Sequence, residues 1–386
     1  GERAKNLLTP DSLATILYTS GTTGEPKGVC LTHRNLVSNA VATLAMFQQQ
    51  EGDLRVNFLP LSHIFARTCD LYTWIASGAE LAIAESRETV IADCGTTRPT
   101  HISGVPYFYD KIYRGLNDAG MADQPGAVKQ LLGGRARMLA SGGAALPDHL
   151  YDFFDKQGTP VLQGYGLTES SPVITVNSPD ARKRGSAGRA IPDGETGIAE
   201  DGEILTRGPH VMQGYWHKDA ATREAIDKQD WLYTGDLGHL DNDGFLFITG
   251  RKKEIIVTAA GKNVAPVLLE SLLCEDPLIL QAIIIGDDRK YLSALIVPDP
   301  DGLRAEITAR GITVTSKEHA LAHADVLAIY EKRITDRLDG LSHHEQVRAF
   351  TLLGRGFTIE SGEMTPKLRL RRDVIAANCA VEIDAR

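Results

Sequence analysis

The order of apolar and polar residues predicts alternating strands and helices through residue 176. Residues 13–19 form a short apolar run rich in β-branched side chains, which predicts a buried strand, and residues 28–32 predict a second strand. From residue 35 to about residue 48, apolar side chains recur at the spacing of a helix. Alternation of this kind is typical of a layered α/β domain. The apolar positions of the predicted helix are Leu36, Val37, Ala40, Val41 and Leu44.

The pattern changes after residue 176, where glycine, proline and charged residues become frequent and the apolar runs become short. We interpret residues 177–250 as a small β-rich subdomain. Beyond it, a basic turn is followed by two apolar runs, residues 282–285 and 295–297, which predict buried strands. Residues 324–341 show apolar side chains at helical spacing, and Gly340 is typical of a helix stop signal.

These patterns predict the fold class α/β with two domains. The large domain, residues 1–250, is expected to pack helices on mixed sheets and to include the β-rich subdomain. The small domain, residues 251–386, is expected to be α+β. A chain of 386 residues, 42% hydrophobic and 24% charged, agrees with a globular protein of more than one domain.

Composition argues against several other classes of protein. A net charge of −9 is unfavourable for a nucleic-acid-binding surface, which needs a basic face. No apolar run approaches the roughly 18–20 residues that span a bilayer, and the start of the chain shows no signal-peptide pattern. The five cysteines form no C-x-x-C pair, which favours buried thiols in a reducing compartment over disulfides or a zinc site. We expect a cytoplasmic protein and leave peripheral contact with a membrane open.

The segment YTSGTTGEPKG, residues 18–28, is the strongest candidate for a binding site. Its glycines allow successive backbone N–H groups to point at an anion, and its hydroxyl side chains add donors. Lys27 adds a compact positive charge suited to phosphate oxygens. The spacing differs from the common G-x-x-x-x-G-K-[ST] loop, and a short glycine-rich loop taken alone is more typical of a flexible hairpin turn. The residues predicted to bind phosphate are Thr19, Ser20, Gly21, Thr22, Thr23, Gly24 and Lys27.

This segment resembles the signature of the adenylate-forming superfamily, which includes acyl-CoA synthetases, luciferases and nonribosomal-peptide adenylation domains. The resemblance implies that the loop holds the β- and γ-phosphates of ATP. Five further motifs of the family follow in order, and together the six motifs extend over nearly the whole chain. They are PLSH (60–63), SGGAA (141–145), GYGLTE (164–169), YTGD (233–236) and GRKKEII (250–256).

The resemblance implies a role for individual residues of these motifs. His63 is placed near the substrate carboxylate, and Tyr165 offers a flat face on which adenine stacks. Glu169 offers an oxygen ligand to the Mg²⁺ bound with ATP, and Asp236 accepts hydrogen bonds from the ribose hydroxyls. Each motif alone is more typical of an ordinary turn or core position, and only the ordered series favours function. The remaining predicted nucleotide-binding residues are Gly143, Ala144, Gly166, Thr168, Arg251, Gly261 and Lys262.

The basic motif at residues 250–256 resembles the family's hinge, with Lys253 as its pivot and a mobile C-terminal domain beyond it. The stretch AGKNVAP, residues 260–266, resembles the long-chain fatty acid branch. The resemblance therefore implies a long-chain fatty acid:CoA ligase (AMP-forming), with fatty acid, ATP and coenzyme A as substrates and Mg²⁺ as cofactor. Two alternatives are a fatty acyl-AMP ligase that loads a carrier protein and a catalytically impaired nucleotide-binding relative.

Two features depart from the family pattern. Long-chain members carry T-P-T-x-K-x-K-R near the C-terminus, whereas this chain has TPKLRLRR at residues 365–372. The catalytic lysine thus becomes Arg369, and Lys367 stands two residues earlier; in an extended segment both side chains face one side, about 6.5–7 Å apart. The chain also begins with Gly1 and lacks the family's portion before the phosphate loop. We expect the chain alone to expose apolar faces, to be poorly soluble or inactive, and to need that N-terminal segment.

Overall fold

The computed structural model describes residues 8–19, 25–47, 49, 51–358, 360–364 and 370–384. The chain divides into two compact units, Gly1–Ile248 and Thr249–Arg386, which are called unit 1 and unit 2. Among the described residues, no helix has the length and apolar character needed to cross a membrane. Four of the cysteines are buried as predicted, but Cys274 is exposed.

A mixed seven-stranded sheet in the order β4-β3-β5-β6-β7-β8-β9 forms the centre of unit 1 in the described part of the chain. The first five strands in this order are parallel, whereas β8 and β9 are antiparallel to their neighbours. The strands are β3 (Leu54–Asn57), β4 (Glu80–Ile83), β5 (His101–Gly104), β6 (Met138–Ser141), β7 (Val161–Gly166), β8 (Val173–Val176) and β9 (Arg189–Ala190).

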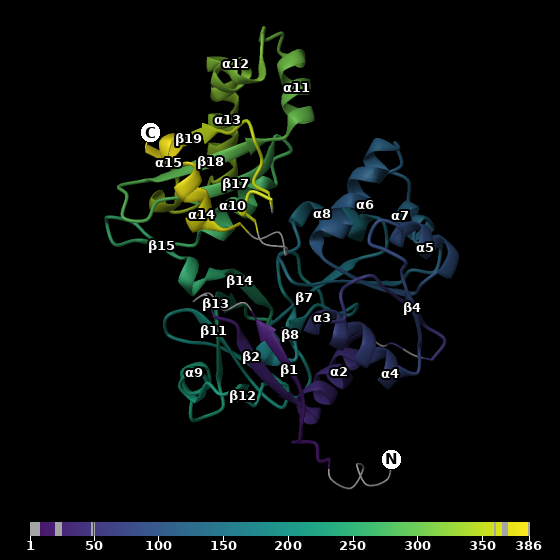
Figure 1. The fold of residues 1–386 in the computed structure, drawn as a ribbon. Helices are drawn as coiled ribbons and strands as arrows, with labels where there is room; N and C mark the ends of the chain where they lie inside the picture. Colours follow the sequence, from purple (N-terminus) through teal and green to yellow (C-terminus); the bar gives the residue numbers. More distant parts are fainter. Residues whose placement is uncertain are drawn as a thin grey trace. The chain divides into compact units, whose positions relative to one another are not determined.

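Helices cover both faces of this sheet, because successive side chains of a strand point to opposite faces. Leu139 of β6 belongs to a core with helices α5 to α8, while its neighbours Met138 and Ala140 pack with α2 and the π-helix η1 on the other face. Figure 1 shows these two groups of helices on either side of the strands. The helices are α2 (His33–Phe47), α3 (Ile64–Ala66), η1 (Arg67–Tyr72), α4 (Thr73–Ser77), α5 (Val90–Thr97), α6 (Pro106–Asp118), α7 (Ala127–Leu131), α8 (Asp148–Lys156) and the 3-10 turn η2 (Thr168–Ser170).

Two antiparallel sheets complete unit 1. One has the order β1-β2-β12 and the other the order β10-β11-β13-β14, which supplies the β-rich part of the chain. The register of β1 and β2 pairs Tyr18 with Gly28 and Thr19 with Lys27, so it joins the two ends of the predicted phosphate loop. The elements are β1 (Leu13–Thr19), β2 (Lys27–Thr32), β10 (Glu195–Ile198), β11 (Glu203–Arg207), β12 (Gly214–Tyr215), α9 (Asp219–Ala225), β13 (Leu232–Leu240) and β14 (Leu246–Arg251).

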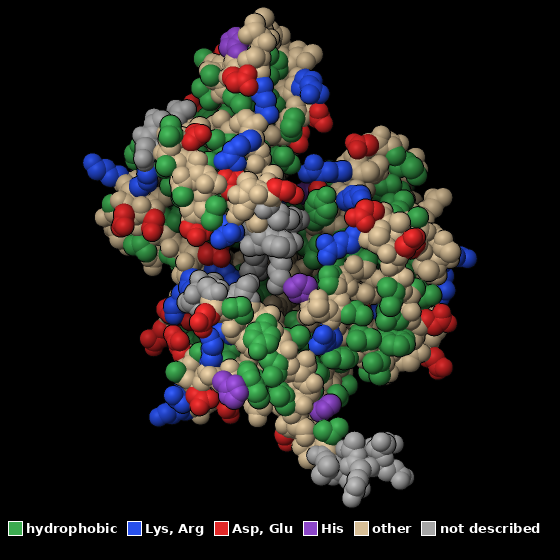
Figure 2. Space-filling view, in the orientation of Figure 1, with side chains coloured by type: hydrophobic (Ala, Val, Ile, Leu, Met, Phe, Trp, Pro, Cys, Tyr) green, Lys and Arg blue, Asp and Glu red, His purple; other side chains and the backbone are tan. Residues whose placement is uncertain are grey.

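The predicted strand at residues 13–19 and the predicted helix from residue 35 are both present, but their burial differs from the prediction. Tyr18 on β1 is 69% exposed, and Val37 and Val41 on α2 are 59% and 53% exposed. The two valines are four residues apart and share one helix face, whereas Leu36 and Ala40 form the buried face. Figure 2 shows hydrophobic side chains on the surface over the region of β1 and α2.

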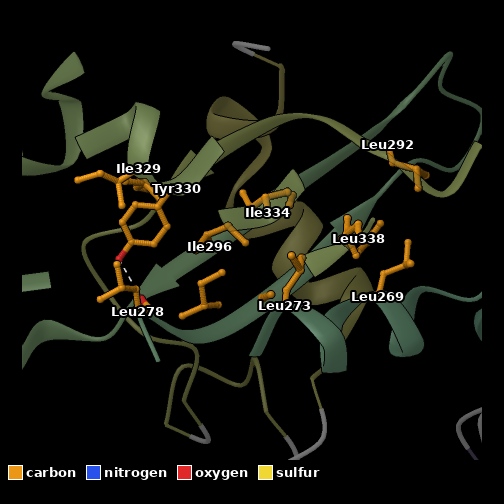
Figure 3. Packing of buried hydrophobic residues seen from close by; sticks show 14 of the residues in the cluster. Leu269, Leu273, Leu278, Leu292, Ile296, Ile329, Tyr330, Ile334 and Leu338 are labelled. Atoms are coloured by element: carbon orange, nitrogen blue, oxygen red, sulfur yellow. Dashed lines mark hydrogen bonds between the residues drawn. The ribbon is translucent and has the colours of Figure 1, made fainter. Parts of the chain in front are cut away.

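Unit 2 is built on the sheet β17-β18-β19 and a hairpin of β15 and β16. One face of the three-stranded sheet packs on helices α10 and α13, where the Tyr330 hydroxyl donates to the Leu278 carbonyl at 2.9 Å (Figure 3). The other face packs on α14 and α15. The elements are η3 (Lys252–Glu254), β15 (Ile256–Val257), β16 (Asn263–Val264), α10 (Pro266–Cys274), β17 (Ile279–Ile285), β18 (Leu292–Pro298), α11 (Pro300–Ala309), α12 (Lys317–Ala322), α13 (Ala324–Arg337), η4 (His343–Glu345), β19 (Val347–Leu352), α14 (Arg372–Asn378) and α15 (Ala380–Asp384).

The two buried strands predicted in unit 2 lie within β17 and β18, and the predicted amphipathic helix is α13. This helix ends at Arg337, four residues before the predicted residue 341. Gly340 follows with φ of 84°, a left-handed conformation that glycine adopts without steric cost. The apolar pattern of the sequence extends beyond the helix because Leu338, the residue after Arg337, is still part of the core.

A buried ion pair connects the parallel sheet to the π-helix η1. Arg55 on β3 donates to Asp70 on η1 at 2.9 Å, and the two side chains are 3% and 1% exposed. Ser103 and Asn57 donate to the same carboxylate at 2.7 and 2.8 Å. A buried charge needs this set of partners, because it has lost its hydration.

We predict that Asp70→Asn strongly destabilises unit 1. The amide keeps the shape of the side chain but leaves the buried Arg55 charge uncompensated, which costs about 3–5 kcal/mol in other buried pairs. Equilibrium urea denaturation would measure the free energy of unfolding. Asp123→Asn is the control, because Asp123 is 94% exposed in its pair with Lys156 and such pairs contribute little. Equal unfolding midpoints for the two variants would contradict the prediction.

Candidate active site

Three of the predicted motifs follow parallel strands of the seven-stranded sheet. Residues 60–63 come after β3 and residues 141–145 begin at the end of β6, while Tyr165 and Gly166 end β7. Parallel strands bring their carboxyl ends to one edge of the sheet, which is where open α/β sheets bind ligands. The sheet therefore gathers His63, Gly143 and Tyr165 along one edge, although the sequence separates them by up to about 100 residues.

The segment that carries His63 is held by its neighbours. His63 is exposed at the start of α3, and its carbonyl accepts from the Arg67 N–H at 3.0 Å. The Arg67 guanidinium donates to Thr15 on β1 at 3.2 Å, and Thr68 donates to the Ser171 carbonyl at 2.8 Å. The sequence did not point to Arg67 or Thr68. Their contacts tie the His63 segment to the strand before the phosphate loop and to the turn that follows Glu169.

Glycines shape the loop after β6. Gly143 has φ of 83°, a backbone conformation that other residues rarely adopt. A Cβ at Gly142 would lie 3.1 Å from the Phe65 ring, so this loop also lies against the His63 segment. Gly143 and Ala144 are exposed, and this loop can therefore offer its backbone to a flat ligand.

Tyr165 and Asp236 are joined by a hydrogen bond. The Tyr165 hydroxyl donates to Asp236 Oδ2 at 2.7 Å, which connects β7 to β13 of a different sheet. Asp236 is buried, and its N–H donates to the Thr234 hydroxyl at 3.1 Å. The contact fixes the orientation of the aromatic ring beside the carboxylate. A ring and a carboxylate in this arrangement suit the base and the sugar of a nucleoside.

Lys27 and Glu169 are bridged by Tyr215, which the sequence analysis missed. The Lys27 ammonium lies 4.7 Å from the centre of the Tyr215 ring, and the Tyr215 hydroxyl donates to Glu169 Oε1 at 2.9 Å. Burial and the nearby Glu169 carboxylate raise the pKa of the Tyr215 phenol, so it stays protonated and can donate. No sequence signal marked this residue, because its role depends on the pairing of β12 with the distant strand β2.

The residues near Glu169 fit a metal ion that arrives with a nucleotide. Among the described residues, no group of three or more His, Cys, Asp or Glu side chains could hold a metal ion. Mg²⁺ bound to ATP needs only one or two protein carboxylates, because phosphates and waters complete its coordination. A single carboxylate connected to the Lys27 cation through Tyr215 therefore suits a magnesium–nucleotide complex.

Four predicted residues lie in unit 2. Arg251 ends β14, which begins in unit 1 and continues past its boundary at Ile248, and Lys253 is exposed in the turn η3 that follows. Gly261 and Lys262 belong to a tight turn in which the Lys262 N–H donates to the Thr258 hydroxyl at 3.2 Å. Gly261 has φ of 71°, as this turn requires. Their proposed roles at the hinge and in nucleotide binding stay predictions.

The remaining predicted residues, Ser20, Gly21, Thr22, Thr23, Gly24, Lys367 and Arg369, lie outside the described residues. The chain on either side of residues 365–369 is joined by a β-bridge between Met364 and Leu370. Next to this bridge, Glu363 is fully buried and accepts hydrogen bonds from Arg355, Ser361 and Asn378. The Arg355 guanidinium lowers the pKa of Glu363 to about 2. This carboxylate therefore stays charged, and in the sequence it stands two residues before residue 365.

Comparison with protein families agrees with this geometry. Residues 1–216 match the AMP-binding enzyme family, and residues 253–385 match the AMP-binding enzyme C-terminal domain. The chain belongs to the AMP-binding enzyme family. This confirms the resemblance to adenylate-forming enzymes, and the chain is an AMP-forming acid–thiol ligase of that family.

Relatives and solved structures support the same assignment. The long-chain-fatty-acid–CoA ligase FadD15 of Mycobacterium bovis is 35% identical over 96% of this chain and 69% of its own length. The long-chain-fatty-acid–CoA ligase ACSBG2 of Gallus gallus is 30% identical, covering 95% of this chain and 57% of that protein. O-succinylbenzoate coenzyme A synthetase from Bacillus subtilis, in complex with ATP and magnesium ion, superposes with a TM-score of 0.73 at 28% identity, over 95% of this chain and 70% of that one.

These matches also confirm the predicted fold class. The family combines a mixed α/β fold with a large N-terminal and a small C-terminal domain, and the AMP-binding sequence match and the structural match extend over both parts of this chain. The adenylate-forming reaction uses ATP and an acid, and the thiol acceptor implied by the family is coenzyme A.

We predict that Asp236→Asn weakens binding of MgATP about 10- to 100-fold. The amide loses the charge-assisted acceptor for the ribose hydroxyls, and a hydrogen bond to a charged group contributes about 1.5–3 kcal/mol. Isothermal titration calorimetry with MgATP would measure the dissociation constant. Tyr165→Phe is the matched variant, because it keeps the ring and removes only the hydroxyl that donates to Asp236; its effect should be smaller. An unchanged dissociation constant in Asp236→Asn would show that this carboxylate does not bind ribose.

Proposed function

We propose that this chain is a long-chain fatty acid:CoA ligase (AMP-forming), which activates a fatty acid with ATP and transfers the acyl group to coenzyme A. Two sets of contacts in unit 1 carry the ATP half of the proposal: Tyr215 contacts both Lys27 and Glu169, and Tyr165 donates to Asp236. The choice of acid is supported by relatives such as FadD15 and ACSBG2, whose names give long-chain fatty acids as substrates. The stretch AGKNVAP at residues 260–266 adds to that support.

In the first half-reaction the fatty acid carboxylate attacks the α-phosphorus of ATP, and pyrophosphate leaves. The protein contributes position and charge, because phosphoryl and nucleotidyl transfer require little covalent chemistry from side chains. Tyr165, Gly143, Ala144 and Gly166 would hold the adenine, and Asp236 the ribose. Lys27 and the loop residues Thr19 to Gly24 would hold the leaving pyrophosphate, with Thr168 also binding the nucleotide and His63 beside the acid.

Mg²⁺ bound with ATP would neutralise phosphate charge, and Glu169 is the residue proposed to hold it. We propose residues 1–250 as the ATP- and acyl-binding domain and residues 251–386 as a mobile domain. In the second half-reaction, rotation about Lys253 would exchange the face that the small domain presents, so that Gly261 and Lys262 line the thioester-forming state. The thiol of coenzyme A then attacks the acyl carbonyl and AMP leaves. Arg251 would contact the ribose and α-phosphate.

For the chain together with the N-terminal segment that we expect it to need, we predict ATP–pyrophosphate exchange that depends on long-chain fatty acids and formation of the acyl-CoA thioester when coenzyme A is added. The rate should fall as the acid is shortened, because each methylene removed from an apolar pocket loses about 0.8 kcal/mol of burial. A panel of saturated acids in the exchange assay, with and without coenzyme A, tests both points. Exchange without thioester would instead indicate a carrier-protein enzyme. A chain that binds MgATP but shows no exchange with any acid would indicate a nucleotide-binding relative without ligase activity.

We predict that Arg369→Lys increases the rate of acyl-AMP formation. A compact ammonium contacts carboxylate and α-phosphate as a point charge, whereas the planar guanidinium has a different shape and reach. Single-turnover measurement of acyl-AMP would give the rate. Lys367→Ala is the companion variant: no gain in Arg369→Lys, together with loss of activity in Lys367→Ala, would assign the adenylation cation to Lys367.

A further inference from the structure

Tyr215 stands between two residues of opposite charge that both serve the phosphates of ATP in the proposed function. Within the described residues no ion pair joins Lys27 to Glu169, although both contact the same tyrosine. Lys27 contacts the face of the ring and Glu169 contacts its hydroxyl. The tyrosine therefore interacts favourably with each of the two charges.

The backbone around Tyr215 also contacts the strand β2, which carries Lys27, and the turn η2, which carries Glu169. Tyr215 pairs with Val29 on β2, two residues after Lys27, and the Gln213 N–H donates to the Cys30 carbonyl at 3.0 Å. On the other side, the Met212 N–H donates to the carbonyl of Glu169 at 2.8 Å. Residues 212–215 thus contact the Lys27 strand by strand pairing and the Glu169 turn through both its main chain and its side chain.

The tyrosine itself is fixed in place. Its N–H donates to the Thr222 hydroxyl of α9 at 2.9 Å. Gly214 has φ of 150°, and a Cβ there would lie 2.7 Å from the methyl group of Thr222, so the strand lies directly against this helix. The Tyr215 side chain therefore projects from a rigid backbone, which is what a positioning residue needs.

We propose that Tyr215 is a positioning residue for magnesium–ATP, which orients the Glu169 carboxylate toward the metal and keeps Lys27 apart from it for the phosphates. This inference rests on the proposed function, since it assumes that the site takes MgATP. A hydroxyl that donates to one carboxylate oxygen restricts the rotation of the carboxylate and would leave its other oxygen for a metal ion. Such partners of metal ligands usually change metal affinity 10- to 100-fold when removed.

Two substitutions separate the two contacts of Tyr215. Tyr215→Phe keeps the ring under Lys27 and removes only the donor to Glu169. Tyr215→Leu removes both the ring and the hydroxyl. Tyr113→Phe, on α6 in a different part of unit 1, is the control for the loss of a tyrosine hydroxyl as such.

The dissociation constant of ATP is measured by isothermal titration calorimetry, in excess EDTA and again across a series of Mg²⁺ concentrations, with the melting temperature recorded for each variant. Tyr215→Phe should bind metal-free ATP with the dissociation constant of the wild type. The factor by which Mg²⁺ tightens ATP binding should be about tenfold smaller in this variant than in the wild type. Tyr215→Leu should weaken binding in both conditions, because Lys27 is then free to pair with Glu169. Tyr113→Phe should change neither constant.

Two outcomes would overturn the inference while leaving the proposed function intact. In the first, Tyr215→Phe shows the wild-type dependence on Mg²⁺. In the second, Tyr215→Phe loses affinity equally with and without Mg²⁺ and melts at a lower temperature, which indicates a structural role alone. If the wild-type chain binds no MgATP, the proposed function and this inference fall together.

Discussion

The inner parallel strands β3, β5 and β6 of unit 1 are almost wholly buried, and this constraint determines where the site can be. Helices on the two faces leave only the strand ends accessible, so polar residues with a chemical role must follow the strands. His63, Gly143 and Tyr165 do so after β3, β6 and β7. Asp236, from another sheet, contacts Tyr165 of this set, and Lys27, from a third sheet, contacts Tyr215, which donates to Glu169 four residues after Tyr165. The site is therefore made of one sheet edge completed by two antiparallel sheets.

Two tyrosines make matching contacts with carboxylates of the candidate site. Tyr165 donates to Asp236 and Tyr215 donates to Glu169, so each of the two carboxylates proposed to bind MgATP receives one phenol hydrogen bond. A neutral donor stabilises a carboxylate without neutralising it, whereas a lysine or arginine in that position would compete with the ligand's own charge. The protein thus holds these two carboxylates in position, as their proposed roles toward the magnesium ion and the ribose require.

Much of this arrangement could be predicted from the sequence, but only where the signal is local. The strand at residues 13–19 and the helix that begins near residue 35 follow from periodicity, and the ordered motifs identify the family. Periodicity could not reveal which apolar side chains are buried: Val37 and Val41 are exposed because α2 buries only the face that carries Leu36 and Ala40. Tyr215 could not be found either, since its contacts depend on strand pairing and on Glu169, 46 residues away.

The segment after His63 shows how the core supports the site edge. A π-helix is less stable than an α-helix and is often retained where function requires it. Here η1 carries Asp70 into the core, where Arg55 and Asn57 of β3 hold it, and Arg67 and Thr68 of the same turn hold β1 and the chain after Glu169. One irregular turn thus fixes the His63 segment to three other parts of unit 1. Because breaking a buried ion pair leaves an uncompensated charge, a shift of this turn would cost several kcal/mol. The buried charges therefore make the position of His63 well defined, even though His63 itself is exposed.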